Sequence, residues 1–356
     1  FRDTHPPDDS RIVFQQWNTD VYDTAGVRDR WGRYREGYGP ESRIVHPEVQ
    51  LDLARRTIPR YLRRYGYTAL FTDCIGYINP RFDTDFSGKT RCGVAAAQRL
   101  HEQLLSYQVR AHGLVLGTEG CCDWAARRVS WCEGAMTLMP AIWGSSPGWG
   151  YRPMNDNYPI QLRPDLRIPF AALTIGDCVT ISCRWDEVMD RYPQHWQIRN
   201  LFTVLYGGSP MFFLDHNGYK ANRDNIRRTA DGVCRAVRAV AGHPMRYHRF
   251  LSEDRMLQES AWEVEGRLRG VTVNFAETAR AVPEGPVLPA RQFALWQERE
   301  NGTRRWQVAG EECRVRDDRR QSFEDLTEDF EEGYTGNLRP CLSGDRGQFR
   351  DVSSDP

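Results

Sequence analysis

Short apolar runs alternate with amphipathic stretches over the first two thirds of the chain. Tyr67–Asp73 and His112–Thr118 are two strand-like runs, and a helix-like stretch over Arg91–Tyr107 lies between them. A strand, a helix and a strand in this order predict a βαβ unit with parallel strands. The pattern predicts strands at Arg11–Trp17, Tyr67–Asp73, His112–Thr118, Gly134–Met139, Phe170–Ile175 and Ser209–Leu214.

Apolar residues at helical spacing fill the segments between these runs. Helices are predicted before Tyr67, over Pro193–Tyr206 and around Ile226–Val240. Repeated βα units with short apolar strands favour a parallel α/β fold. A closed barrel needs eight strands, and about six are found, so we expect an incomplete (β/α)8-type barrel in a piece of a longer protein.

The pattern changes after about Tyr247. Leu268–Phe275 alternates with period two, and Phe293–Trp296 follows a Pro-rich spacer. These runs predict a small β-sandwich-like segment behind the barrel. We therefore expect a partial catalytic barrel over residues 1–246, the start of a β-rich domain over 247–298, and a charged, weakly structured tail over 299–356.

Two acidic residues stand at the ends of consecutive predicted strands. Asp73 ends the first run, and Glu119 directly follows the second. Parallel strands would bring both to the carboxyl edge of one sheet, where α/β barrels keep their catalytic groups. Each acid alone could equally cap a helix or anchor a loop. Two carboxylates on one rim are, however, the minimum needed to cleave a glycosidic bond.

Further candidates follow other predicted strands or lie in a Gly- and Pro-rich loop over residues 142–150. Polar side chains there could bind sugar hydroxyls, and indole rings could stack on sugar faces. Each of them taken singly is more often structural. The candidate substrate-binding residues are Trp17, Asp20, Asp123, Trp124, Trp143, Trp149, Asp177, Arg184, Trp185, Asp215 and His216.

Composition excludes several other classes. The formal net charge is zero, so no basic surface predicts a nucleic-acid partner. No apolar run reaches the length of a membrane span. The 10 Cys form no CxxC pair, and His-Glu-x-x-His is absent, so a metal site is not predicted. Buried free thiols are favoured, although disulfides stay open. Gly144–Gly148 matches G-x-S-x-G, but Pro147 lacks the N–H that a nucleophile elbow requires.

From about Arg11 to Phe275 the chain resembles the retaining α-glycosidases of glycoside hydrolase families 101 and 129, the α-N-acetylgalactosaminidase group. The resemblance implies an aspartate nucleophile at Asp73, a glutamate acid/base at Glu119, and no organic cofactor. It rests on Phe71–Asp73, Gly117–Gly120 with Asp123 and Trp124, Ile175–Asp177, Cys183–Trp185, Gly208–Pro210, Phe250–Arg255 and Val271–Phe275.

The expected function is a retaining glycosidase that cleaves α-linked glycosides, possible substrates being α-N-acetylgalactosaminides, by a two-carboxylate double displacement. A non-catalytic carbohydrate-binding relative is the alternative, and a structural domain whose acids are caps is a third hypothesis. The separation of the carboxyl groups discriminates, because about 5–5.5 Å suits retention and about 6.5–9.5 Å suits inversion. The sugar, the compartment and the oligomeric state stay open.

Overall fold

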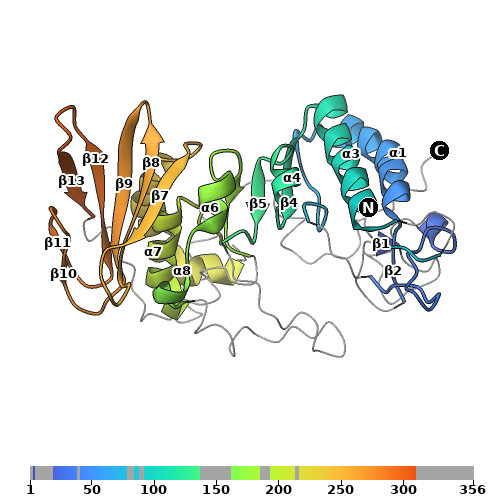
Figure 1. The fold of residues 1–356 in the computed structure, drawn as a ribbon. Helices are drawn as coiled ribbons and strands as arrows, with labels where there is room; N and C mark the ends of the chain where they lie inside the picture. The colour runs from blue at the N-terminus through green and yellow to red at the C-terminus, as the bar shows by residue number, and fades with distance from the viewer. Residues whose placement is uncertain are drawn as a thin grey trace. The chain divides into compact units, whose positions relative to one another are not determined.

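A computed structural model describes residues 3–4, 19–37, 41–77, 84–87, 92–136, 162–184, 193–212 and 216–309. The chain divides into two units. The first unit comprises Phe1–Gln161 and Pro169–Arg184, and the second comprises Leu162–Ile168 and Trp185–Pro356. The sheet and helices of each unit are labelled in Figure 1.

The first unit is built on a four-stranded parallel sheet. β3 pairs with β4, and the helix α3 (Val94–His112) connects them. The predicted βαβ unit is therefore confirmed. The strand order is β3 (Ala69–Phe71), β4 (Val115–Glu119), β5 (Trp131–Glu133) and β6 (Thr180–Ile181).

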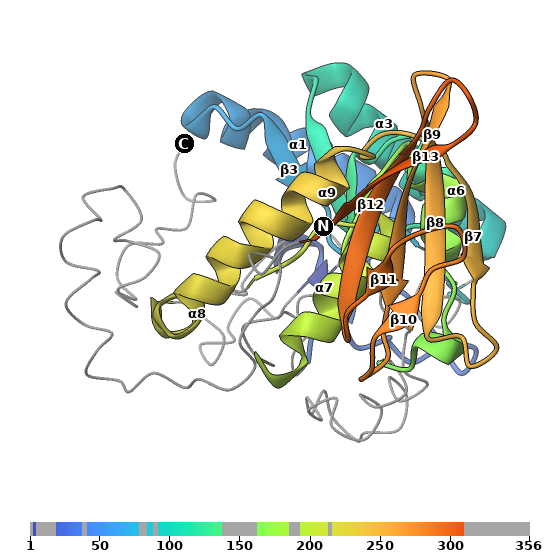
Figure 2. The ribbon, with the colours of Figure 1, turned by 90° about the vertical axis from the view of Figure 1, so that its left-hand side faces the viewer.

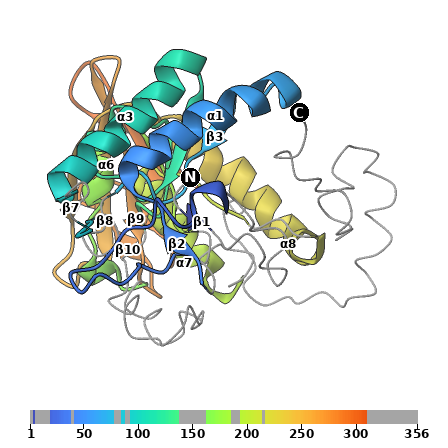
Figure 3. The ribbon, with the colours of Figure 1, turned by 90° about the vertical axis from the view of Figure 1, so that its right-hand side faces the viewer.

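Two long helices cover one face of this sheet. α1 (Pro47–Tyr65) starts with a proline in its first turn, and α3 ends at Gly113, which has a left-handed φ of 64°. The two helices lie side by side (Figure 3) and contact each other. Their apolar stripes bury a common core with the sheet; its fully buried members include Leu104, Leu105, Leu116, Ala54 and Ala125.

The alternation along β3 and β4 decides which residues face away from the helices. Leu70 and Leu116 pack into the helix-facing core. Their neighbours Phe71 and Val115 therefore point to the other face, where they are 40% and 48% exposed. Glu119 shares the parity of Val115 and so belongs to this second face.

One predicted strand of the first unit is wrong. Phe170–Ile175 forms the helix α6, and the strand β6 follows it at Thr180–Ile181. A six-residue apolar run does not distinguish a buried strand from a short helix by periodicity. Here Phe170 and Leu173 are exposed while Ala172 is buried, which is a one-sided helical pattern.

Two further predicted strands differ from the structure. The strand expected at Gly134–Met139 occurs earlier as β5, Gly134 with a φ of 90° follows its end, and residues 137–139 lie outside the described residues. Ser209 forms a single β-bridge, and Pro210–Phe212 forms no strand, since Pro210 has no N–H for a sheet ladder. Phe213, Leu214 and the predicted strand Arg11–Trp17 lie outside the described residues.

The second unit begins with helices. A 3-10 turn, η7 (Pro193–His195), leads into α7 (Trp196–Tyr206). α8 (His216–Arg228) continues through a π-helical turn, η8 (Thr229–Val233), into α9 (Cys234–Arg238). The helices predicted over Pro193–Tyr206 and around Ile226–Val240 are thus confirmed.

A five-stranded antiparallel sheet follows these helices (Figure 2). α7 packs against β8 and β9 on one face. The strands predicted at Leu268–Phe275 and Phe293–Trp296 are β9 and β12. The order is β13 (Arg304–Val308), β12 (Gln292–Glu298), β9 (Arg267–Asn274), β8 (Leu257–Val264) and β7 (Met245–Phe250), with a small hairpin of β10 (Arg280–Ala281) and β11 (Val287–Leu288).

β13 lies beyond residue 298, within the segment expected to be a weakly structured tail. Its sequence, Arg-Arg-Trp-Gln-Val, is charged and mostly exposed, as edge strands often are. It pairs along its whole length with β12. The remaining short strands, β1 (Asp3–Thr4) and β2 (Arg43–Ile44), pair with each other in the first unit.

Candidate active site

The loop after β3 is fixed over the end of β4. The N–H of Thr72 donates to the Gly117 carbonyl, and the Thr118 hydroxyl donates to the Thr72 carbonyl at 3.0 Å. The same hydroxyl accepts from the N–H of Gly76 at 2.9 Å. A side chain at Gly76 would collide with the Gly120 carbonyl oxygen. A close backbone approach that only glycine permits therefore holds this loop against β4.

The loop and β4 bring two carboxylates together. Asp73 is exposed directly after β3, and Glu119 is 8% exposed at the end of β4. One carboxylate oxygen of each lies within 4.8 Å of the other and of the Cys74 sulfur. The prediction that Asp73 and Glu119 meet on neighbouring parallel strands is confirmed.

Both oxygens of Glu119 have protein partners. An Arg184 guanidinium nitrogen, NH1, lies 2.5 Å from Oε1, and the Cys74 thiol donates to Oε2 at 2.9 Å. Arg184 follows β6 and is 6% exposed. A buried arginine thus supplies the positive charge that a buried carboxylate requires.

The pKa of Glu119 lies above its ordinary value of 4.5. Burial is the largest cause, because it disfavours the charged form. The Arg184 guanidinium and the Cys74 thiol act in the opposite direction, and the neighbouring Asp73 carboxylate raises the pKa further. The net result is a carboxyl group that holds its proton to higher pH than a free glutamate.

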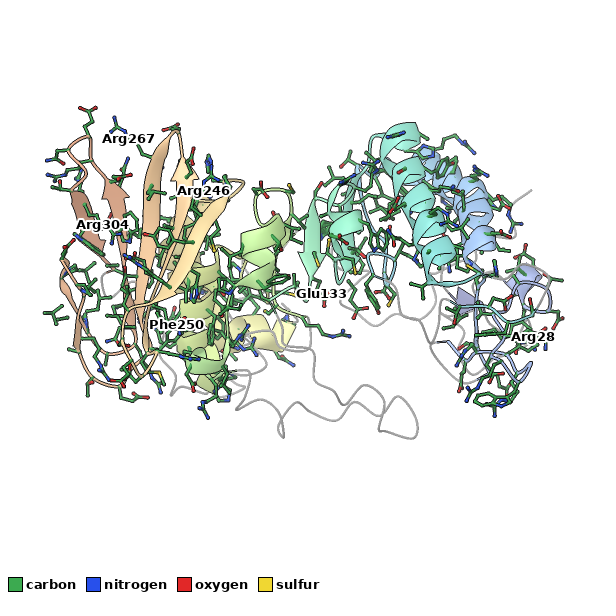
Figure 4. The ribbon with its side chains drawn as sticks, viewed as in Figure 1. Arg28, Glu133, Arg246, Phe250, Arg267 and Arg304 are labelled. Atoms are coloured by element: carbon green, nitrogen blue, oxygen red, sulfur yellow. The ribbon has the colours of Figure 1, made fainter. Side chains whose placement is uncertain are left out.

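Sequence reasoning missed three residues around this pair. Glu133 ends β5, is 8% exposed, and is the register partner of Glu119. Figure 4 places it at the carboxyl end of its strand. It was missed because the strand was predicted to begin at Gly134. Cys74 was expected to be a buried thiol, and Tyr77, whose hydroxyl contacts the Cys74 sulfur at 3.4 Å, carried no signal.

Asp123 and Trp124 lie on the short helix α4 (Asp123–Ala126), just after β4. Asp123 is exposed, and its carboxylate accepts the N–H of Trp124 at 2.9 Å. Trp124 is half-buried and packs against the core of the first unit, with its ring centroid 6.5 Å from that of His101. Asp123 is therefore the more available of the two for a ligand.

Two other candidates contact residues other than the acid pair. Asp20 is exposed in the 3-10 turn η2 (Thr19–Val21) and pairs with Arg56 of α1 at 2.9 Å. Asp177 is exposed in the turn after α6, where it accepts from the Cys178 thiol at 3.4 Å. Because Phe170–Ile175 is a helix, the expectation that Asp177 ends a strand is wrong.

The remaining candidates differ in what the structure describes of them. His216 begins α8 in the second unit and is half-buried. Trp17, Trp143, Trp149, Trp185 and Asp215 lie outside the described residues. Of the predicted substrate-binding residues, only Arg184 directly contacts one of the two acids within the described part of the chain.

Asp73, Cys74 and Glu119 have donor atoms close enough together to hold a metal ion. The Arg184 contact with Glu119 argues against that use, because a guanidinium already supplies positive charge to this carboxylate. We therefore interpret the cluster as an acid pair balanced by a protein cation. Among the described residues, no helix combines the length and apolarity needed to cross a membrane.

Comparisons with known proteins point to a related enzyme family. Residues 3–149 match the family model for glycosyl hydrolases related to the GH101 family, GH129. Asp73 and Glu119 both lie inside the matched region. No curated protein matches the chain. The predicted relationship to glycoside hydrolase families 101 and 129 is thereby confirmed.

Solved structures of the α-N-acetylgalactosaminidase NagBb from Bifidobacterium bifidum are similar. The ligand-free form is 18% identical, with a TM-score of 0.52 over 77% of this chain and 39% of that chain. The GalNAc complex is 19% identical with a TM-score of 0.52, and the Gal-NHAc-DNJ complex is 18% identical with 0.53, each over 77% of this chain and 40% of that chain. The chain thus spans about two fifths of these relatives, and the likeness is one of fold.

Proposed function

We propose that this relative of glycoside hydrolase families 101 and 129 is a retaining glycoside hydrolase that cleaves α-linked glycosides. The observation that carries the proposal is the closeness of Asp73 and Glu119, whose nearest carboxylate oxygens lie within 4.8 Å. Retaining enzymes keep their two carboxyl groups about 5–5.5 Å apart, whereas inverting enzymes need room for a water between them. Oxygens this close leave no room for that water, which supports retention over inversion.

In the first step Asp73 attacks the anomeric carbon as the glycosidic bond breaks. Asp73 is exposed, so a sugar can reach it. Glu119 gives its proton to the departing oxygen, and a covalent glycosyl ester on Asp73 remains. In the second step Glu119 takes a proton from water, the water attacks the anomeric carbon, and the ester bond to Asp73 breaks.

The environment of Glu119 suits this exchange of roles. Burial raises its pKa, so the protonated form persists to higher pH than for a free glutamate. Arg184 stabilises the carboxylate that forms after the proton leaves. A general acid that becomes a general base needs both forms to be accessible near the working pH.

The first substrates to test are α-N-acetylgalactosaminides. The structural relatives are named as α-N-acetylgalactosaminidases, and one contains GalNAc. Asp123 begins the short helix α4 just after β4 and is exposed, and we propose it as a ligand for sugar hydroxyls. We assign the same role to Asp20, Asp177, Asp215 and His216, and a stacking role to Trp17, Trp124, Trp143, Trp149 and Trp185.

We also propose that the parallel sheet is part of a (β/α)8-type barrel. Parallel sheets in α/β proteins normally have both faces covered. Here Phe71 and Val115 stay 40% and 48% exposed on the face opposite the helices. Further strands would complete the barrel on that side. The proposed catalytic region is 1–246, followed by a β-rich domain from 247.

A carbohydrate-binding protein without turnover is the second candidate. One observation favours it: both oxygens of Glu119 already have partners, Arg184 and Cys74. A carboxylate with both oxygens hydrogen-bonded could stay ionised, and it would then bind a sugar without donating the proton that cleavage requires. A substrate that displaces neither partner would bind without being cleaved.

The test is hydrolysis of aryl α-N-acetylgalactosaminide by the whole chain, with the first-formed sugar anomer read by proton NMR. We expect the α-anomer, and loss of hydrolysis in Asp73→Asn. Asp52→Asn, which changes an exposed acid on α1 of the same unit, is the matched control and should keep hydrolysis. First release of the β-anomer would contradict retention, and binding without hydrolysis would favour the second candidate.

A further inference from the structure

A thiol lies beside the two acids. Cys74 directly follows Asp73, and its sulfur lies within 4.8 Å of a carboxylate oxygen of both Asp73 and Glu119. It is half-buried. The proposed mechanism makes no use of this thiol.

The Cys74 thiol donates one hydrogen bond and accepts another. Cys74 donates to Oε2 of Glu119 at 2.9 Å, and the Tyr77 hydroxyl contacts the sulfur at 3.4 Å as its donor. The other carboxylate oxygen, Oε1, is paired with Arg184 at 2.5 Å. Because Arg184 holds Oε1, Oε2 is the oxygen left to meet a glycosidic oxygen, and the thiol stands in that place.

We propose that Cys74 is a positioning residue for the acid/base: its thiol holds Oε2 of Glu119 until the glycosidic oxygen of a substrate takes its place. This inference rests on the proposed function. A thiol is a weak hydrogen-bond donor, so it can orient the carboxyl group and still be displaced by a bound sugar. An ammonium or guanidinium group at the same place would bind too strongly to leave.

The backbone of Cys74 supports a role for its side chain. Its φ of 56° lies in the left-handed region, which glycine adopts freely and which costs other residues roughly 1–2 kcal/mol. Two positions further, Gly76 allows the tight contact with β4. A glycine at 74 would relax the loop, yet the strained position carries a cysteine. Strain of this kind is found where a side chain has a use.

The electrostatics agree with this position. The Cys74 hydrogen bond lowers the pKa of Glu119 against the larger effect of burial. Removing the thiol donor should therefore raise the pKa of Glu119. In a retaining enzyme this moves the alkaline limb of kcat/KM, which reports the loss of the proton from the acid, to higher pH.

The experiment compares the wild-type chain with Cys74→Ala, Cys74→Ser and Cys178→Ala. Glu119 is followed by carbon NMR of labelled glutamate carboxyl groups, assigned by its absence in Glu119→Gln. Cys178→Ala is the matched control, because Cys178 also donates to a carboxylate, that of Asp177, in the same unit. Should Cys74→Ala fail to fold, Cys74→Gly removes the same thiol and relieves the left-handed strain.

We expect Glu119 to titrate at higher pH in Cys74→Ala, and close to wild type in Cys74→Ser and Cys178→Ala. On the alkaline limb, the kcat/KM of Cys74→Ala should exceed that of the wild type by roughly two- to tenfold, because the lost hydrogen bond to Glu119 is worth that factor in its proton affinity. An unchanged Glu119 titration in Cys74→Ala, or an equal change in Cys178→Ala, overturns the proposal. If Glu119 shifts as expected and the wild type still hydrolyses no glycoside, the proposed function fails, and with it the positioning role, while the Cys74–Glu119 hydrogen bond is supported.

Discussion

Each unit of this chain buries a glutamate next to arginine, and the two sites differ in everything else. Glu119 stands at the end of a parallel strand and is 8% exposed, whereas Glu259 lies inside the antiparallel strand β8 and is fully buried. Glu119 has one guanidinium, one weak thiol donor and a second acid as neighbours. Glu259, by contrast, has two guanidinium groups as neighbours.

The carboxylate of Glu259 is satisfied by four side chains. Arg249 and Arg304 contact it at 2.6 and 2.9 Å, the Tyr247 hydroxyl donates at 3.0 Å, and the Thr272 hydroxyl at 2.9 Å. Figure 4 shows Arg304 on the sheet of the second unit. A fully hydrogen-bonded ionic network of this kind fixes one arrangement of strands.

The comparison separates two uses of a buried charge. The network around Glu259 leaves no oxygen for a ligand, so it is structural. Glu119 lies where the sheet ends, beside an exposed acid, and its pKa is raised. A perturbed acid with an exposed partner at a strand end indicates chemistry.

The largest expected effect is on turnover at Glu119. Glu119→Gln cannot donate a proton, so glycosides with poor leaving groups should slow by roughly 10²–10⁴-fold. Activated aryl glycosides need no proton and should slow far less, and azide should rescue them by filling the space of the lost base. Steady-state kinetics on both substrates test this, with the exposed Asp52→Asn on α1 as control. Equal loss on both, without rescue, would remove Glu119 from the acid/base role.

The next largest effect is on stability at Glu259. Glu259→Ala leaves Arg249 and Arg304 facing a buried gap, which should cost about 3–5 kcal/mol in the free energy of unfolding. Hydrogen exchange of the β8 and β9 amides measures this for the second unit. Glu263→Ala is the control on the same strand, because the Glu263–Arg246 pair is half exposed and worth about 1 kcal/mol or less. Equal losses would contradict a structural role for Glu259.

Arg184→Met should have an intermediate effect. It leaves Glu119 without its cation, which costs about 1–3 kcal/mol, less than at Glu259 because Glu119 can take up a proton. The pKa of Glu119 then rises further, and the folded state binds more protons than the unfolded state above the ordinary value of 4.5. Stability should therefore fall more steeply with rising pH than in the wild type. Denaturant unfolding between acid and neutral pH checks this, and a parallel curve would contradict it.

The smallest effect is expected at Tyr247. Burial, followed by the Glu259 carboxylate, raises the pKa of Tyr247 to about 12. The folded state therefore keeps the phenol proton while the unfolded state loses it from about pH 10, and stability falls as pH rises between those values. Tyr247→Phe should lose about 1 kcal/mol at neutral pH and show a shallower alkaline decline. An unchanged alkaline slope would show that other groups cause the decline.

The sequence was sufficient where local pattern and topology agree. The βαβ unit between Tyr67 and Thr118 has two apolar runs of strand length and an intervening helix, so the adjacency of Asp73 and Glu119 followed directly. The strand at Leu268–Phe275 followed in the same way from its alternation. The βαβ unit and this strand both form through contacts between elements that are adjacent in the sequence.

The features that the sequence did not predict depend on tertiary packing, which the hydrophobic pattern does not reveal. The run Phe170–Ile175 is apolar enough for a strand, but its backbone is helical and it buries only Ala172. β8 interrupts its alternation with buried Gln258 and Glu259, whose partners include Pro164 and Thr272 in other segments. Likewise, the contacts of Cys74 with Glu119 depend on a left-handed φ that no spacing of residues reveals.

The most direct test of the account is to trap the glycosyl-enzyme. A fluorinated α-glycosyl donor with an activated leaving group slows both steps but lets the first proceed, so the ester accumulates on the attacking carboxylate. We predict that peptide mapping of the whole chain finds the label on Asp73. A label on Asp123, Asp177 or Asp215, with Asp73→Asn still turning over, would contradict the central claim.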